Sequence, residues 1–513
     1  MSPIPMSATL YTHFLTCHPF KLTSEFLPIW EIFRIFVRVQ EIFLGIGKDA
    51  RIGKRVGRLI DRMVEKNSSV INFCCESHAE RIAAYRLINN YRLVMEDVVS
   101  AIASECSRQC SGSAHVLCIQ DTTELCYDNH SGRLSPEDGD FGYGTANVEE
   151  YCIFAHPTLV VDAESRIPMG FSHMDVWNRS LERSSGQAKR QRRKLLKLEE
   201  KESFRWAEAA AKSAANLPAV VRKTMVGDRE SDIYTVMSRT LDYGCDFLFR
   251  SVHDRVVGSD GEGLEEYMLS LPSAYTYNLK LRGRKGRKSR TARMHLRFSE
   301  VTFHKYHRCV DDVPETLTCY CVHALEDDST VPEGEEPIEW RLLTSHVVDS
   351  VDMAVQCVEW YKCRWFVEEL FRVCKSDGFR LESAQLETGA AIKRLTVLTM
   401  FAALRCMALK RAYDEKDEAV PASAMFNEEE MELLDTEMQI IHRKSPKALD
   451  GNNPFTKKSM PWAAWIIGRL GGWSGYESAH GKPGYITMKK GLDRFNQHLE
   501  IISFTKARDV YKE

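Results

Sequence analysis

The stretch HVLCIQD, residues 115–121, decides the fold class of this chain. Its apolar run Val116–Ile119 is short and uninterrupted, a pattern typical of a strand that is buried on both faces of a sheet. The run leads directly to Asp121, and a second run, Thr224–Gly227, leads in the same way to Asp228. Buried strands that alternate with helical segments predict an α/β protein, in which ligands bind at the strand ends.

Periodicity on both sides of these runs predicts how the rest of the chain is organised. The spacing of apolar residues predicts a helical N-terminal domain over residues 1–110 and two helices over 351–413. The central domain, 111–413, contains strands and polar loops at 252–350 that predict a β-rich insertion. A helical C-terminal domain is expected over 414–513. The further strands that we expect are Tyr151–Val161, Ile167–Phe171, Phe247–Phe249, Leu279–Leu281, Met294–Phe298, Thr318–Val322 and Trp340–Leu343.

Composition excludes several classes of protein. The 513 residues are 44% hydrophobic and 27% charged, which is the balance of a globular chain with several domains and not of a disordered one. Charges interrupt the apolar segment Phe26–Leu44, which argues against a membrane span or signal peptide and for an amphipathic helix. The 16 cysteines include no CxxC pair, so we expect reduced core thiols in a cytosolic protein.

Charge is distributed unevenly along the chain. The net charge of −3 does not by itself predict a nucleic-acid partner. The runs Lys189–Lys197 and Arg282–Arg293, however, are rich in lysine and arginine, as is the helical stretch from Arg51 to Arg62. Such runs either bind a phosphate backbone or form a solvated face of the protein.

Asp121 and Asp228 are the first candidate site residues. A carboxylate just after a buried strand is held by rigid backbone and still points out of the core. Two such carboxylates could share a hard cation such as Mg²⁺, which prefers oxygen ligands. The structural alternative is that each aspartate caps the next helix or forms a turn. Asp232 is expected in the first turn of the helix after Asp228.

The segment WYKCRWFVEELFRVCK, residues 360–375, adds a third acidic residue. Its aromatic and aliphatic side chains predict a mostly buried helix, in which clustered charges need a partner such as a metal or a phosphate. A salt-bridged helix surface is the alternative. On one continuous helix, Glu369 points about 100° away from Glu368. The residues that fall within about 80° of one another on that helix are Tyr361, Arg364, Glu368, Arg372 and Lys375.

The spacing Tyr-x2-Arg-x3-Glu-x6-Lys within this segment resembles the YREK signature of insertion-sequence-four family transposases, of the transposon-five transposase type. Two further stretches, which begin at Asp121 and Asp228, resemble the two aspartate motifs of that family: Asp-Thr-Thr-x-Leu-x-Tyr and Asp-Arg-Glu-x-Asp-Ile. Segments around Trp206 and over Gly468–Gly472 also look like family segments. The resemblance runs in order from about residue 49 to about residue 500.

This resemblance implies a fold and an activity. The fold is a ribonuclease-H-like catalytic core with a β-rich insertion. The activity is that of a DDE transposase, which binds the inverted ends of a transposon and catalyses cut-and-paste DNA cleavage and strand transfer. Asp121, Asp228 and Glu368 would hold two Mg²⁺ ions, or Mn²⁺ in their place, for in-line displacement at phosphorus.

The resemblance also implies contacts to DNA. Trp340 would stack on a base flipped out in a hairpin intermediate, although a core aromatic is the alternative. Arg250 would contact DNA or form a structural salt bridge. Residues 1–45 and Ile52 depart from the family pattern. The residues expected to bind DNA are Tyr361, Arg364, Lys375, Trp340, Arg250, Arg51 and Arg55.

Three readings of the function follow from this comparison of motifs. The first is an active transposase that binds double-stranded transposon ends and target DNA in a synaptic homodimer. Its partner surface would lie near 460–500, and the protein would work in the bacterial cytoplasm at the nucleoid, without a membrane. The second is a non-catalytic DNA-binding relic that inhibits transposition. The third is a metal nuclease of the same fold that lacks strand transfer.

Overall fold

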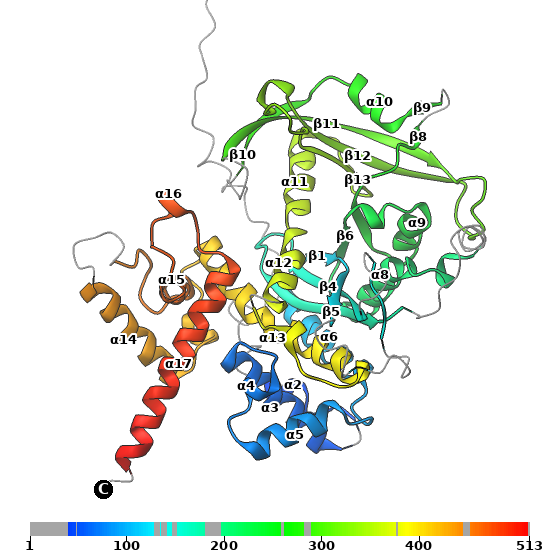
Figure 1. Ribbon diagram of the computed structural model, residues 1–513. Coiled ribbons are helices and arrows are strands. Elements are labelled where there is room, and N and C mark those ends of the chain that lie inside the picture. The colour runs from blue at the N-terminus through cyan, green and yellow to red at the C-terminus, as the bar shows by residue number, and fades with distance from the viewer. Residues whose placement is uncertain are drawn as a thin grey trace, which may run out of the picture.

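The computed structural model describes residues 39–47, 49–127, 134, 141–145, 151–179, 196–257, 261–281, 289–375, 378–444 and 452–510. Most of the predicted helix Phe26–Leu44 therefore lies outside the described residues, as do most of Lys189–Lys197 and of Arg282–Arg293. Figure 1 shows a central sheet with helices packed against it, a group of N-terminal helices, and the C-terminal helices beside them.

The sheet is mixed and has eleven strands. At its centre, β1 (His115–Gln120) is parallel to β6 (Arg222–Gly227) and antiparallel to β4 (Tyr151–Asp162). Next to these, β7 (Asp246–Arg250) is parallel to β6, and β5 (Pro168–Trp177) is antiparallel to β4. The order β5-β4-β1-β6-β7, with these directions, is a ribonuclease-H-like core. The prediction of an α/β fold is confirmed.

Helices cover both faces of this core. Leu117 and Ile119 of β1 face the hydrophobic core that contains α13 (Gly389–Glu415). The alternate residues Val116 and Cys118 face a second core, which contains α8 (Phe204–Asn216) and α9 (Tyr234–Asp242). A strand with apolar packing on both faces has no polar alternation, which is why the sequence shows an uninterrupted apolar run there.

The segment between β7 and the helix that begins at Val351 extends the same sheet. It forms β10 (Tyr275–Leu281), β11 (Arg290–His304), β12 (Thr316–Glu326) and β13 (Glu339–Thr344). β13 pairs antiparallel with β7, so the added strands pair with the edge that the core would otherwise leave open. α11 (Val351–Lys362) then packs on β11, β12 and β13.

The buried helix α13 connects the sheet with both helical regions. It contacts β5, α3 (Ala50–Lys66) of the N-terminal region, and α15 (Met460–Leu470) and α17 (Tyr485–Val510) of the C-terminal region. Residues Met460–Gly468 of α15 are buried inside the chain. Within the predicted partner surface near 460–500, α17 is therefore the more accessible helix, and its end extends away from the body (Figure 1).

Two further expectations concern membranes and cysteines. None of the described helices is long and apolar enough to cross a bilayer. The described cysteines are free thiols, and all but Cys126 and Cys309 are buried. The described thiols thus match the prediction of reduced core residues.

A buried histidine pair predicts how stability depends on pH. His115 and His346 both contact Thr224 Oγ1, at 2.8 and 2.7 Å. Burial lowers the pKa of each imidazole to about 4. As the pH falls below the unfolded pKa of 6.5, the unfolded chain takes up protons that the folded protein excludes, so stability is lost.

We expect a loss of about 2 kcal/mol between pH 7 and pH 5.5, measured from urea unfolding curves. The double variant His115→Gln/His346→Gln is expected to lose this pair's contribution of about 2 kcal/mol and to keep the part that comes from His156 and His173, whose pKa values burial also lowers. The same steep profile in the double variant would show that other groups cause it.

Candidate active site

The ends of β1 and β6 bring the two predicted aspartates together. The strands are parallel, with Ile119 opposite Val226. Asp121 and Asp228 each follow two residues later, so they leave the sheet from neighbouring positions about 4.8 Å apart. Asp121 Oδ1 accepts from the Thr122 amide at 2.8 Å, and Asp228 Oδ1 accepts from the Glu230 amide at 2.9 Å. Asp228 therefore caps a short 3₁₀ helix, as the structural alternative predicted, and this uses one oxygen of its carboxylate.

Arg364 connects the third carboxylate to the first. It directly precedes α12 (Trp365–Cys374), and its side chain is only 10% exposed. Its Nη1 donates to Asp121 Oδ2 at 3.2 Å, and its Nη2 donates to Glu368 Oε1 at 2.5 Å. One guanidinium thus holds carboxylates from the first and third motifs at one end of the sheet.

The electrostatics of this place favour a bound cation. Burial, together with the charges of Asp228 and Glu368, raises the pKa of Asp121 to about 7 against the opposing effects of Arg364 and the Thr122 amide. A cation bound beside Asp121 would favour its ionised form, which burial disfavours. Arg364 Nε is buried and has no hydrogen-bond partner among the described residues.

The prediction of one continuous helix over 360–375 is wrong. The chain forms α11 and α12, and the Arg364 amide between them bonds to the Tyr361 carbonyl at 3.0 Å, an i→i−3 bond. Such bonds turn the chain by about 120° per residue, which changes the helical face. Arg372 stays within about 40° of Glu368 on α12, but its side chain donates to Glu369 at 2.6 Å. Glu369 itself pairs with Arg372 away from the other two carboxylates.

Tyr361, Trp340 and Arg250 lie beside Arg364. The Arg364 guanidinium is 5.8 Å from the centre of the Tyr361 ring, and the Trp340 ring lies 6.4 Å beyond that of Tyr361. Burial lowers the pKa of Arg250. Tyr361 raises this pKa, whereas the charges of Arg229 and Arg364 lower it further. Arg250 Nη2 donates to the backbone carbonyl of Glu339 at 2.8 Å, which is a structural hydrogen bond but not the salt bridge that the alternative named.

Lys375 lies at the far end of α12 and reaches the strand that follows Asp121. Its Nζ donates to the Glu124 carbonyl of β2 (Thr123–Cys126) at 2.7 Å. Of the four residues of the YREK spacing, Arg364 contacts Asp121, Tyr361 and Glu368 contact Arg364, and Lys375 contacts the strand after Asp121.

Sequence reasoning missed Arg205. Its Nε donates to Thr122 Oγ1 at 3.0 Å, and its Nη2 donates to Glu230 Oε2 at 2.6 Å. It thereby connects the residue after Asp121 with the second aspartate motif. Thr122 Oγ1 also contacts the buried His156 Nδ1 at 3.0 Å, and burial lowers the pKa of His156. The signal in the sequence is its position next to Trp206, within a segment that resembles the family.

The prediction that Asp232 lies in the first turn of a helix is wrong. It lies between the 3₁₀ helix Arg229–Ser231 and α9, and its side chain is fully buried. The chain turns inward there, because Asp232 accepts hydrogen bonds from the Val252 amide at 2.7 Å and from the His253 amide at 3.0 Å. Of the two aspartates in this motif, only Asp228 lies at the site.

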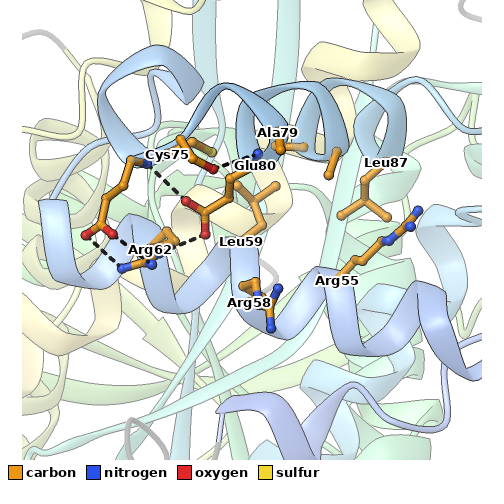
Figure 2. Close-up of a pocket in the computed structure, with 12 residues that line it drawn as sticks. Arg55, Arg58, Leu59, Arg62, Cys75, Ala79, Glu80 and Leu87 are labelled. Carbon is orange, nitrogen blue, oxygen red and sulfur yellow. Dashed lines mark hydrogen bonds and ion pairs between the residues drawn. The ribbon is translucent and has the colours of Figure 1, made fainter.

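A second basic region lies in the N-terminal helices. Figure 2 shows Arg55 and Arg58 of α3 at a cavity of about 460 Å³, with Leu87 of α5 (His78–Ile88) on its other side. Arg62 is held by Glu80 at 3.0 Å. Arg55 is exposed and makes no hydrogen bond or ion pair with any described residue.

Arg51 and Ile52 are neighbours in the first turn of α3, and Arg51 is exposed whereas Ile52 is buried. The Arg51 side chain is 83% exposed, although its Nε donates to the helix-capping Asp49 at 3.1 Å. Ile52 is buried in the core, so a basic residue would be desolvated at that position. The departure from the family pattern at Ile52 is thus a packing residue.

The ribonuclease-H-like sheet, with acidic residues at the ends of its strands, defines a class of proteins that act on nucleic-acid phosphodiesters. Residues 47–93 match the family model described as Transposase DNA-binding, and residues 177–405 match that described as Transposase DDE domain. The chain therefore carries a transposase DNA-binding domain and a transposase DDE domain, and these two domains support a DNA transposase of the DDE class. The second match includes Asp228 and Glu368 and begins after Asp121. The narrower transposon-five assignment stays a prediction.

DDE transposase domains use divalent metal ions, and the donor set here is suited to one. Asp121, Asp228 and Glu368 offer carboxylate oxygens, the ligands that Mg²⁺ prefers. Their oxygens do not all lie within 4.8 Å of one another in the described part of the chain, because Arg364 stands between two of them. The residues therefore fit a metal site that requires Arg364 to move aside.

Proposed function

We propose that the protein binds inverted transposon ends and catalyses cut-and-paste DNA cleavage and strand transfer, with Asp121, Asp228 and Glu368 as its catalytic carboxylates. The observation that carries the proposal is the double contact of Arg364 with Asp121 and Glu368 at 3.2 and 2.5 Å, next to the strand end that bears Asp228. A group suited to phosphate thus sits among three groups suited to a metal.

The three carboxylates would hold two Mg²⁺ ions, with Mn²⁺ as a substitute. When bound, the ions would activate the attacking water or DNA 3′-hydroxyl and offset the charge on the leaving oxygen of an in-line displacement. Asp121 is buried, so its carboxylate lies in a medium of low dielectric. There the attraction between the carboxylate and a cation would be stronger than in water.

Arg364 would act in two positions. In the metal-free protein it pairs with both Asp121 and Glu368. In the DNA complex its guanidinium turns toward a phosphate next to the cut, for which its planar pair of donors is suited. Tyr361 lies under the guanidinium, and Lys375 adds a point charge from the end of α12.

Trp340 would stack on a base extruded from a hairpinned DNA end. Its ring is half-buried on β13 and lies 6.4 Å from the Tyr361 ring, so a base on its exposed side would be close to the phosphate contacts. Arg250, beside Tyr361, would support the same DNA strand.

The N-terminal helices would deliver the transposon end. Arg51 and Arg55 are exposed on α3 inside the matched DNA-binding region, and Arg58 lines the cavity beside them. We further propose a homodimer in the synaptic complex, with accessible parts of α17 as a contact surface, acting at the bacterial nucleoid.

The test uses the full chain with DNA that carries the element's own inverted ends. With Mg²⁺ we expect cleavage at the ends, a hairpin product, and joining to target DNA; with EDTA we expect none of these. Binding of the ends without any cleavage would favour the inhibitory relic. Cleavage without joining would favour a nuclease.

Replacement of Arg364 by glutamine tests its two positions. We expect cleavage to fall about 100-fold because a charged contact to the transition state is lost. We also expect Mg²⁺ to raise the melting temperature more in Arg364→Gln than in the unchanged protein, because the ion no longer has to displace a guanidinium.

The matched control is Arg372→Gln, which removes an arginine from the same helix that pairs only with Glu369 among the described residues. We expect its cleavage rate to stay within about threefold, the effect of a surface ion pair. Equal losses of cleavage in the two variants would mean that Arg364 acts only through its positive charge on this helix and not through its position at the site.

A further inference from the structure

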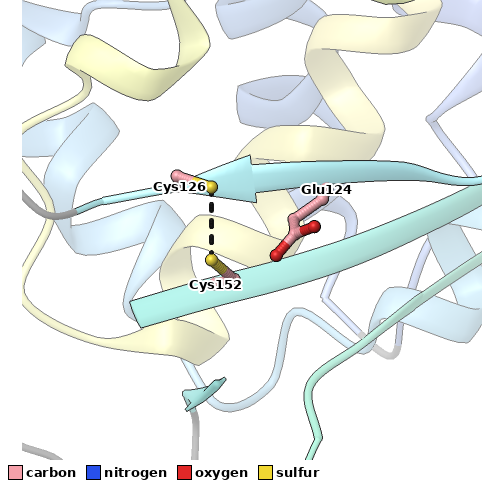
Figure 3. Close-up of side chains that lie close together, drawn as sticks. All are labelled: Glu124, Cys126 and Cys152. Atoms are coloured by element: carbon pink, nitrogen blue, oxygen red, sulfur yellow. Dashed lines mark hydrogen bonds between the residues drawn. The ribbon is translucent and has the colours of Figure 1, made fainter. Parts of the chain in front are cut away.

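A cluster of two thiols and a carboxylate lies outside the proposed active site. Glu124 and Cys126 are on β2, and Cys152 is on the neighbouring β4. One ligand atom of each lies within 4.8 Å of the others, and Figure 3 shows the two sulfurs facing each other with the Glu124 carboxylate beside them. Among the described residues, these three form the group of acidic, cysteine or histidine side chains whose ligand atoms all lie within 4.8 Å of one another.

The backbone fixes the two thiols opposite each other. β2 and β4 are antiparallel, and Cys126 is in register with Cys152. The Cys126 amide donates to Glu382 Oε1 at 3.2 Å and so points away from β4. The cysteines therefore form a non-hydrogen-bonded cross-strand pair, the kind in which the side chains approach most closely. Their Sγ atoms are 3.2 Å apart.

The cluster is poorly suited to holding its own negative charge. Burial raises the pKa of the Cys152 thiol, and Cys126 and Glu124 raise it further. Glu124 Oε1 accepts from the Thr145 amide at 2.7 Å, which is a neutral donor. Two thiols that lose their protons beside this carboxylate would need a cation among them.

We propose that Glu124, Cys126 and Cys152 bind one thiophilic divalent cation of the zinc class. Two thiolates and a carboxylate are ligands that Zn²⁺ takes, with water in the fourth position. Two bonds of about 2.3 Å at the tetrahedral angle place the sulfurs about 3.8 Å apart, so the thiols would move apart by about 0.6 Å from their separation of 3.2 Å. On binding, two S–H protons pass to solvent and two metal–sulfur bonds form.

This site would stabilise the strand that leads from the proposed catalytic centre. β2 begins two residues after Asp121, and its Glu124 carbonyl accepts from Lys375 Nζ at 2.7 Å. The Cys126 amide contacts Glu382, which follows α12 in the chain. A cation that ties β2 to β4 would therefore limit the movement of the backbone that Lys375 holds.

The first test is a titration of the reduced, full-length, metal-free protein with Co²⁺ and then Zn²⁺, without DNA and with excess Mg²⁺ present. We expect one equivalent of Co²⁺ to give a sulfur-to-metal charge-transfer band that Zn²⁺ removes. Cys126→Ser and Cys152→Ser should each lose the band, with affinity reduced by more than about 100-fold. Glu124→Gln should keep the band and bind about tenfold more weakly.

The matched control is Cys309→Ser, which changes the other half-exposed thiol of the described chain. Its band should be unchanged. In the unaltered protein, Zn²⁺ should also protect Cys126 and Cys152, but not Cys309, from alkylation, as read by peptide mass spectrometry. This measurement does not depend on folding of the serine variants.

Absence of the charge-transfer band, its persistence in both serine variants, or alkylation of Cys126 and Cys152 at the same rate with and without Zn²⁺ would overturn the proposal. None of these readouts requires DNA cleavage. They therefore stand or fall separately from the transposase activity.

Discussion

Replacement of Glu368 by glutamine is expected to lower the rate of transposon-end cleavage by at least about a thousandfold, whereas Glu369→Gln leaves the rate within about twofold. A thousandfold corresponds to about 4 kcal/mol of transition-state stabilisation, which is the scale of a lost charge contact at a metal-assisted phosphoryl transfer. The prediction rests on the proposed roles of the three carboxylates.

The reason for the difference is where the two adjacent glutamates point. Glu368 meets Arg364, which also holds Asp121, whereas Glu369 meets Arg372. Glutamine keeps the size of either side chain and removes its charge. It therefore weakens a metal ligand at Glu368 and only a peripheral ion pair at Glu369.

The measurement is single-turnover cleavage of labelled end DNA in Mg²⁺, together with DNA binding by each variant. Binding of the ends should be unchanged in Glu368→Gln, which separates lost chemistry from lost recognition. If Glu369→Gln were as inactive as Glu368→Gln, the choice of Glu368 over Glu369 as the third catalytic carboxylate would be wrong.

The sequence predicted the strand ends well because burial on both faces leaves a mark in it. The apolar run before Asp121 and the one before Asp228 correspond to β1 and β6. That the two strands are adjacent and parallel was implied only by the family resemblance, because strand pairing depends on contacts between distant segments. The register of Ile119 with Val226 required the structure.

The turn between α11 and α12 was less accessible to prediction. Nothing in the residues 360–375 breaks a helix: there is neither proline nor glycine in that segment. The helical count still selected Glu368 over Glu369, but it placed Arg372 with the wrong glutamate. Arg205 was missed for a related reason, since its link from Thr122 to Glu230 joins three segments far apart in the chain.

The second aspartate motif shows how similar side chains take separate roles. Asp228 and Asp232 are four residues apart, and both are acidic residues of the family pattern. Asp228 lies beside Asp121, whereas Asp232 is fully buried and bonds to the segment after β7. It connects the core with the start of the inserted strands, because Arg255 Nη1 donates to its Oδ1 at 2.5 Å.

Asp232→Ala is therefore expected to destabilise the protein by about 3–5 kcal/mol, the cost of leaving one partner of a buried ion pair without the other. Two backbone amides, those of Val252 and His253, lose their acceptor as well. Hydrogen exchange measured by mass spectrometry should show the segment 251–257 exchanging much faster in this variant, while peptides of β1 change least.

The control is the double variant Asp232→Ala/Arg255→Met, which removes the orphaned guanidinium and keeps an apolar side chain over Phe303. Its melting temperature should recover part of the loss, because two contacting residues are not additive. If instead Asp232→Ala is as stable as the unaltered protein but loses Mg²⁺ binding, Asp232 is a metal ligand and does not serve to connect the two segments. The same pair of measurements on Asp228→Ala should give the opposite pattern, with metal binding lost and exchange at 251–257 unchanged, because Asp228 caps only one short turn beside its proposed metal.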